Sequence, residues 1–449
     1  MRLSRPLKLT ATATAFIALT ACSSIPFFGN SGNDDKEQLD KAGRVTMVLA
    51  EEAVEAKPEL ATESIELLPP TDMASWPEAG GTPAKAPGHV NAAPDLKIAW
   101  RNSVGKGSSN KSAVTTPPVA SETAIYTLDA DQTIYSTEIS NGRTLWKKEL
   151  KGLTKRDKTA LGGGLAVTDG TLIVASGFGY VTRVSAEDGT ELWKRELGVP
   201  MTGAPTVKDG TIFVASNNNE VFALDLETGE TDWSDQAIAE SARVLGSPSP
   251  AAIEDFVIAP YSSGEIIAYL ANNGRRLWTD AISQAGRFTP ISEINDIGSR
   301  PVLAGGLVFA SSQSGITVAI DGRSGNRVWA RPIGSTQAPA LSGKFLFVIG
   351  TNATLAALDA GSGDAYWVTE LPQYKNEKKK KKRISYSGPL LASGRILIVS
   401  SYGELLAFDP QTGEQTASLD IKGTTYIEPI AVQGKVFLLT DEAKLVAIQ

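Results

Sequence analysis

The residues that most often carry catalysis or bind transition metals are scarce in this chain. Its 449 residues include one cysteine, Cys22, and one histidine, His89. A single histidine cannot supply a histidine-rich metal site, and it lies in a Pro-Gly-His segment with no sign of a catalytic triad. A single cysteine cannot form an intramolecular disulfide or a thiolate metal site. The sequence therefore predicts no catalytic residue, no bound metal and no cofactor.

Cys22 instead lies where a lipid-attachment residue is expected. Residues 2–8 carry three positive charges, and residues 9–21 are apolar or small. This run is too short to be a stable membrane span. Its end, Leu-Thr-Ala-Cys, resembles the bacterial lipobox, so we expect residues 1–21 to be a signal peptide and Cys22 to be acylated. Such an anchor tethers a protein without spanning the membrane. Ser23 favours the outer membrane, by resemblance to enterobacterial sorting rules.

A repeat dominates the remainder of the chain. Each copy has a β-like run, a polar turn that ends in Gly, and a Trp four residues after that Gly. The clearest copy, residues 221–233, reads Val-Phe-Ala-Leu-Asp-Leu-Glu-Thr-Gly-Glu-Thr-Asp-Trp. Successive copies are 38 to 51 residues apart, a period typical of a β-propeller. The anchor pairs are Gly142/Trp146, Gly189/Trp193, Gly229/Trp233, Gly274/Trp278, Gly325/Trp329, Gly363/Trp367 and Gly413/Ala417.

One repeat contains four short strand-like runs. In residues 203–236, runs rich in β-branched residues are separated by Gly, Asn and Asp clusters, which predicts a four-stranded antiparallel meander. Asp225 and its equivalents, four residues before the Gly, are expected to cap the turn with their side chains. The Gly supplies a positive φ. We expect the Trp, on the outer strand, to cover the gap between neighbouring blades.

The two ends of the repeat region predict how the ring closes. Residues 444–448 match the third strand of a blade, and residues 96–101 supply a fourth strand that would otherwise be missing. Pairing them removes an open sheet edge. We therefore expect an all-β, eight-bladed β-propeller over residues 96–449, closed by an N-terminal strand. The eight outer-strand positions are 100, 146, 193, 233, 278, 329, 367 and 417.

Residues 22–95 predict an extended linker before the propeller. Six prolines lie in residues 69–95, so we expect this part to drape over the propeller with Trp76 as a packing anchor. A strand over residues 44–50 and a short helix over 51–61 are also predicted. The whole chain carries a net charge of −7, and nothing indicates a global basic surface for nucleic acid.

Three connections are candidates for interaction. Residues 237–250 and 286–300 place apolar side chains, including Phe288, in polar loops, where they either contact a partner or fold back on the rim. Residues 375–383 read Lys-Asn-Glu-Lys-Lys-Lys-Lys-Lys-Arg. We interpret this run as a solvated, disordered loop, with contact to anionic lipid or an acidic partner as the alternative.

The lipobox, the Asp-x-x-Thr-Gly-x-x-x-Trp-like repeats and the closing strand together resemble the pyrroloquinoline-quinone repeat superfamily. Within it, the chain resembles the BamB family of outer-membrane assembly-factor lipoproteins, and its long linker resembles alphaproteobacterial members. The resemblance implies a non-enzymatic subunit of the machinery that inserts β-barrel proteins into the outer membrane. The implied partners are a BamA-like barrel protein, bound through its POTRA domains, and the other lipoproteins of the complex. The implied location is the periplasmic face of the outer membrane.

The family's partner-binding loops correspond here to Ala242, Arg243, Val244 and Leu245. The sequence departs from the enterobacterial pattern in this loop, and Ser262 and Ser263 stand where acidic residues accompany the patch. Two other functions stay open. One is a different envelope lipoprotein scaffold. The other is a periplasmic quinoprotein dehydrogenase, which would need a calcium site, a catalytic Asp and usually a disulfide between adjacent cysteines.

Overall fold

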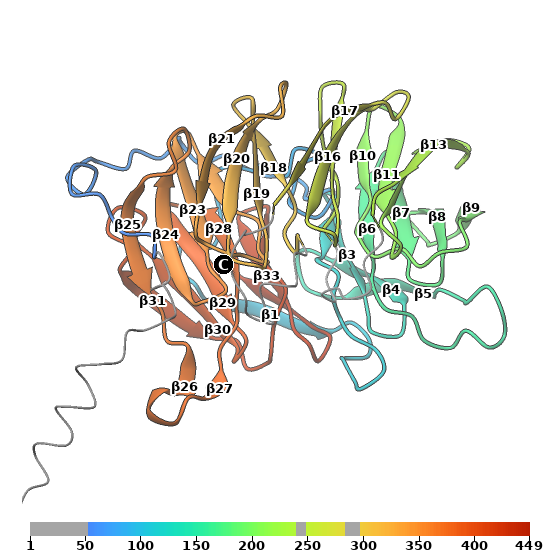
Figure 1. The fold of residues 1–449 in the computed structure, drawn as a ribbon. Helices are drawn as coiled ribbons and strands as arrows, with labels where there is room; N and C mark the ends of the chain where they lie inside the picture. Colours follow the sequence, from blue (N-terminus) through green and yellow to red (C-terminus); the bar gives the residue numbers. More distant parts are fainter. Residues whose placement is uncertain (1–52, 239–247, 283–296) are drawn as a thin grey trace, which may run out of the picture. The chain divides into compact units, whose positions relative to one another are not determined.

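The computed structural model describes residues 53–238, 248–282 and 297–449. Eight four-stranded antiparallel sheets surround a central axis and form an eight-bladed β-propeller, as predicted (Figure 1). The only helical element in the described ranges is the 3₁₀ turn η1 (Glu377–Lys379). The predicted strand over residues 44–50 lies outside the described residues.

The first four blades follow one another along the chain, each running from its inner to its outer strand. They are β2 (Val119–Ala120), β3 (Ala124–Leu128), β4 (Thr133–Glu138) and β5 (Thr144–Glu149); β6 (Gly163–Thr168), β7 (Thr171–Ser176), β8 (Tyr180–Ser185) and β9 (Glu191–Glu196); β10 (Thr206–Lys208), β11 (Thr211–Ala215), β12 (Glu220–Asp225) and β13 (Thr231–Gln236); and β14 (Ala251–Ile253), β15 (Phe256–Pro260), β16 (Glu265–Leu270) and β17 (Arg276–Ala281).

The last four blades repeat this order, and a hairpin is inserted before blade 7. They are β18 (Val302–Ala304), β19 (Leu307–Ser311), β20 (Thr317–Asp321) and β21 (Arg327–Arg331); β22 (Ala340–Ser342), β23 (Phe345–Ile349), β24 (Thr354–Asp359) and β25 (Ala365–Glu370); β28 (Tyr386–Ala392), β29 (Arg395–Ser400), β30 (Glu404–Phe408) and β31 (Gln415–Asp420); and β32 (Ile430–Val432), β33 (Lys435–Leu439), β34 (Lys444–Ile448) and β1 (Ile98–Ser103). The hairpin is β26 (Tyr374–Asn376) and β27 (Lys381–Arg383).

The closing strand behaves as the sequence predicts. β1 pairs antiparallel with β34, with Trp100 opposite Ala447 and Ser103 opposite Lys444. Blade 8 therefore combines residues from both ends of the repeat region. Because β1 covers the outer edge of β34, the third strand of blade 8 is not left as an open sheet edge.

Burial explains the composition of the strands. Second and third strands are sandwiched between neighbouring blades, and all six residues of β7 are buried. Such strands favour unbroken runs of Val, Ile, Leu and Ala. Outer strands are buried on one side only, so β5, β9 and β13 alternate between half-buried and exposed residues.

The repeat tryptophans join neighbouring blades. The indole Nε1 of Trp193, on β9, donates to the carbonyl oxygen of Leu226 in the next blade at 3.0 Å. The same bond, at 2.8 to 3.2 Å, is made by Trp100, Trp146, Trp233, Trp278, Trp329 and Trp367. The turn glycines have φ between 69° and 78°, and Asp225 Oδ1 accepts from the backbone N–H of Thr228. The predicted roles of the Trp, Gly and Asp positions are confirmed.

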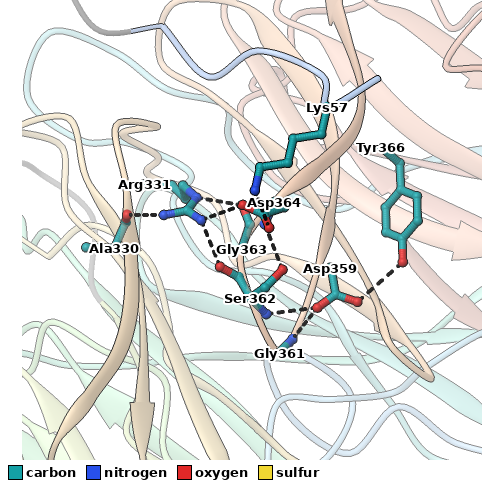
Figure 2. A network of polar contacts seen from close by, with 9 residues as sticks. All are labelled: Lys57, Ala330, Arg331, Asp359, Gly361, Ser362, Gly363, Asp364 and Tyr366. Atoms are coloured by element: carbon teal, nitrogen blue, oxygen red, sulfur yellow. Dashed lines mark hydrogen bonds and ion pairs between the residues drawn. The ribbon is translucent and has the colours of Figure 1, made fainter. Parts of the chain in front are cut away.

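The segment before the propeller is tied to its surface. Lys57 forms an ion pair with Asp364 at 2.8 Å, and Asp364 also contacts Arg331 of the neighbouring blade at 2.7 Å (Figure 2). Residues 53–61 form a β-bridge and a turn, so the helix predicted there is wrong. Only one turn forms, in which Leu60 N–H and Ala61 N–H donate to the Lys57 carbonyl, and Lys57 N–H itself donates to the Ala365 carbonyl of the propeller.

Candidate interaction surface

The meander gives the propeller two different faces. Connections from an outer strand to the next inner strand, and turns between second and third strands, lie on one face, called here the funnel face. The remaining turns lie on the opposite face, called here the linker face. Residues 65–93 run across the linker face, where Leu68 N–H donates to Ser342 Oγ and Ala93 N–H donates to the Gly434 carbonyl.

Residues 76–93 close the central channel from the linker face. Their backbone bonds to the first strands or first turns of blades 1, 2, 4, 5, 7 and 8 in that order, through Ala120, Val167, Ala252, Leu303, Leu391 and Gly434. Trp76, 2% exposed, packs in the core beside blades 1, 7 and 8. The predicted anchoring role of Trp76 is confirmed. The segment does not only cover the surface, as predicted, because residues 76–93 also occupy the axis of the ring.

A buried ion pair lies inside this closure. Lys85 Nζ is 2.5 Å from Glu78 Oε2 and donates to Thr206 Oγ1 of β10 at 2.8 Å. Burial lowers the pKa of Lys85 and raises the pKa of Glu78, and their mutual attraction opposes both shifts. An isolated charge here would be costly, so each residue is needed to keep the other in place.

A second pair crosses the channel. Arg300, at the entrance to blade 5, contacts Glu428, at the entrance to blade 8, at 2.5 Å. Blades 5 and 8 are not neighbours, so this pair spans the ring. The Arg300 charge also acts on the pKa of Lys85. The axis is thus filled by the chain's own paired charges.

The funnel face opens into a cavity of about 670 Å³ above these residues. Ala79, Arg300 and Glu428 line its base, and its wall includes residues from the connections of most blades, such as Thr115, Gly162 and Gln337. Tyr426, 54% exposed, lies at its edge. Many wall residues are Gly, Ala, Ser, Thr or Pro, and few carry a charge.

The base of the predicted partner loop is held firmly. The loop residues Ala242, Arg243, Val244 and Leu245 lie outside the described residues. Before the loop, Asn219 Nδ2 donates to the Ile238 carbonyl at 2.6 Å, and Ile238 N–H donates to Glu265 Oε2 at 3.1 Å. Ser262 Oγ donates to Asn219 Oδ1 at 2.7 Å, and Ser263 Oγ to Glu265 Oε2 at 2.9 Å. Both serines therefore support this base. Ile238 itself is 63% exposed.

A tyrosine pair supports the same region from beneath. The hydroxyls of Tyr261 and Tyr269 are 2.7 Å apart, and Tyr269 donates to Asp235 at 2.8 Å. Arg276 binds both Asp235 and the Gln236 carbonyl. Burial raises the pKa of both tyrosines well above the usual range. They stay protonated, and we assign them a structural role.

The remaining sequence candidates have structural explanations or no described position. His89 is buried; its Nδ1 donates to the Leu68 carbonyl and its Nε2 accepts from Gly394 N–H, each at 2.7 Å. Cys22 and Phe288 lie outside the described residues. Residues 375–383 are exposed, but they form the β26–β27 hairpin, so the disordered-loop interpretation is wrong. Side-chain bonds from Asn376 and Glu377 to the local backbone order them.

The sequence reasoning missed the four axial charges. One signal was present: Glu78 and Lys85 are the only Asp, Glu, Lys or Arg residues between 73 and 94. Within the described ranges, no group of three or more His, Cys, Asp or Glu side chains is placed to hold a metal ion. No described helix is long and apolar enough to cross a membrane.

Comparisons with known proteins agree with this architecture. A family model described as "Outer membrane protein assembly factor BamB" matches residues 130–369. Proteins of that name from Shigella dysenteriae and Escherichia coli are 31% and 30% identical over 240 residues, which is 53% of this chain and 61% of each relative. The match thus spans about three fifths of the length of these curated relatives.

Solved structures with a similar fold cover more of the chain. The crystal structure of BamB from Moraxella catarrhalis superposes with a TM-score of 0.64 at 15% identity, covering 78% of this chain and 99% of that one. A quinohemoprotein alcohol dehydrogenase from Pseudomonas putida gives a TM-score of 0.65 at 13% identity, covering 84% of this chain and 80% of that one. The propeller is common to both kinds of protein, so the fold does not distinguish them.

Proposed function

The chain belongs to the family of the outer membrane protein assembly factor BamB, and we propose that it is a non-enzymatic scaffold subunit of the complex that assembles outer-membrane β-barrel proteins. In this proposal the protein is held at the periplasmic face of the outer membrane by acylated Cys22. Its funnel face binds the POTRA region of a BamA-like barrel protein, through the loop that contains Arg243.

The observation that carries the proposal is the closed channel. Residues 76–93 and the pair formed by Arg300 and Glu428 occupy the axis. A protein partner would therefore bind the exposed connections of the funnel face, which are numerous and are held by rigid blades. Loops on a rigid scaffold are the usual location of a protein-binding surface. The firmly held base beneath the loop after Ile238 supports the same assignment.

Affinity purification tests the proposal directly. The tagged lipoprotein is isolated from detergent-solubilised envelopes, and its partners are identified by mass spectrometry. We expect a POTRA-containing barrel protein as the main partner, and the Cys22-anchored form is used so that the complex is captured at its membrane. Recovery of a different envelope complex would replace this function with another scaffold role.

The dehydrogenase alternative needs its own control because that fold is also matched. A bound quinone would give the purified protein a stoichiometric visible chromophore. We expect the absorbance spectrum to contain only the aromatic side-chain band. A quinone band at one equivalent per chain would favour an enzyme.

A further inference from the structure

The β26–β27 hairpin is a concentrated positive surface that the assembly role does not use. Residues 375–383 contain seven positive charges and one negative charge, and all nine residues are exposed. The nine residues carry a net charge of +6. Because the whole chain carries −7, the other 440 residues carry −13. The hairpin is therefore a basic projection on a chain that is acidic as a whole.

The base of the hairpin is fixed to the propeller. Lys375 Nζ lies 4.0 Å from the ring centroid of Tyr402, and Arg383 Nη2 donates to the Thr351 carbonyl at 2.9 Å. Ile384 N–H donates to the Gln373 carbonyl at 2.8 Å. Figure 1 shows the hairpin projecting beyond the ends of the neighbouring strands. The following residues, Ser385 to Ser387, line the funnel cavity, so the projection belongs to the funnel face.

The tip is ordered by its own backbone contacts. Asn376 Oδ1 accepts from Lys379 N–H at 3.0 Å, and Glu377 Oε1 accepts from Tyr374 N–H at 2.8 Å. The single acidic residue of the hairpin is thus engaged with the backbone. Lys380 and Lys382 have φ of 46° and 62°, a conformation that Gly or Asn adopts with less strain. Turn geometry therefore does not account for lysine at these positions.

Five consecutive lysines follow Glu377 in the hairpin. Among the described residues, no carboxylate forms an ion pair with Lys378, Lys379, Lys380, Lys381 or Lys382. Five like charges held on a short turn repel one another, and an external anionic surface would relieve this repulsion.

We infer that the hairpin binds the anionic headgroups of a phospholipid bilayer. A cluster of four to eight lysines and arginines is typical of proteins that contact anionic lipid. A protein partner is less well matched, because the buried centres of protein interfaces are rich in aromatic residues and depleted in lysine. No apolar residue lies between 375 and 383. Because the rest of the chain is acidic, the contact would also orient the funnel face toward the bilayer.

Vesicle co-sedimentation tests this inference separately from assembly. The full chain with Cys22→Ser is used, so that no acyl group masks the electrostatic term. One set of vesicles contains phosphatidylglycerol and phosphatidylcholine in equal parts, and the other contains phosphatidylcholine alone. The second set measures any binding through residues 9–21. Each is repeated at about 1 M salt, where the Debye length falls to ~3 Å.

A matched pair of variants identifies the surface. The hairpin variant is Lys378→Gln with Lys379→Gln and Lys381→Gln. The control, Lys97→Gln with Lys147→Gln and Lys435→Gln, removes the same charge elsewhere. We expect salt-sensitive binding to the phosphatidylglycerol vesicles, reduced roughly tenfold to a hundredfold by the hairpin variant and about unchanged in the control. Thermal melting confirms that both variants are folded.

Three results would overturn the inference. They are equal binding to both vesicle types at low salt, an equal loss in the control variant, and retained vesicle binding in the hairpin variant. If that variant instead loses affinity for a purified POTRA region, the hairpin is a protein contact. Failure of the lipid inference leaves the assembly proposal intact, because the envelope purification tests that separately.

Discussion

The indole ring of Trp193 lies against Gly229 of the next blade. A Cβ atom built on Gly229 would be 2.7 Å from the ring. A Cβ atom built on any of the seven turn glycines would likewise lie 2.5 to 3.0 Å from the Trp of the preceding blade. The Gly and the Trp of one repeat are therefore not partners of each other. Each serves a different blade interface, so one short motif joins a blade to both of its neighbours.

Replacement of Gly229 should show how much this contact matters. Gly229→Ala both imposes a side chain at φ of 69° and forces it against the indole. Gly210→Ala is the matched control, because its φ is 80° but nothing lies within 4 Å of the added carbon. We expect Gly210→Ala to lower the free energy of unfolding by about 1 kcal/mol, and Gly229→Ala by about 1–3 kcal/mol more.

Chemical denaturation of the two variants measures this difference. Trp193→Leu provides a further check, because it removes the ring that the new methyl group meets. In that background the extra cost of Gly229→Ala should shrink. An equal cost for Gly229→Ala and Gly210→Ala would mean that the indole moves aside freely.

The propeller could be predicted because the residues that define each blade lie close together in the sequence. The Asp225 cap, the Gly229 turn and the Trp233 position fall within nine residues of one another. Blade number follows from counting copies, and the closing strand follows from the missing partner of residues 444–448. Each of these inferences depends on contacts that recur with the repeat.

The channel closure could not be predicted in the same way. Lys85 meets Glu78 seven residues away, but its other neighbours, Thr206 and Arg300, lie 121 and 215 positions along the chain. No periodicity encodes such a set. Likewise, the low strand propensity of lysine favours a loop over residues 375–383, whereas side-chain bonds from Asn376 and Glu377 order that hairpin.

Loss of Lys85 should destabilise the protein strongly. Lys85→Met leaves Glu78 buried without its counter-ion, at an expected cost of about 3–5 kcal/mol. Burial already raises the pKa of Glu78 above 4.5. A carboxyl with a raised folded-state pKa binds its proton more tightly in the folded state, so its contribution to stability falls as pH rises through that pKa.

The variant should consequently be less destabilised near pH 5 than near pH 8. Denaturation at both values measures the difference. Adding Glu78→Gln to Lys85→Met removes the titrating group, so it should recover part of the stability and remove this pH dependence. A cost for Lys85→Met that is small and independent of pH would show that water reaches the pair readily.

Cys22→Ser tests the anchor. Without the thiol no acyl group can be attached, so we expect the mature protein to leave the membrane fraction. Metabolic labelling with a radioactive fatty acid should mark the native protein but not the variant. Washing with salt separates electrostatic attachment through the hairpin from attachment through lipid. A variant that stays in the membrane fraction at high salt would contradict the predicted lipid anchor.

Arg243→Glu tests the partner loop. The residue follows the held base at Ile238, and reversal of its charge should weaken binding to a purified POTRA region by about tenfold, equivalent to about 1.4 kcal/mol. Because a surface substitution typically changes stability by less than about 0.5 kcal/mol, the melting temperature should hardly change.

Arg275→Glu is the control: it makes the same reversal on an exposed turn of the linker face of blade 4. Equal affinity for both variants and the native protein in a calorimetric titration would exclude the Arg243 loop. Equal weakening by both would indicate long-range attraction rather than contact, because only a contact depends on which face carries the charge.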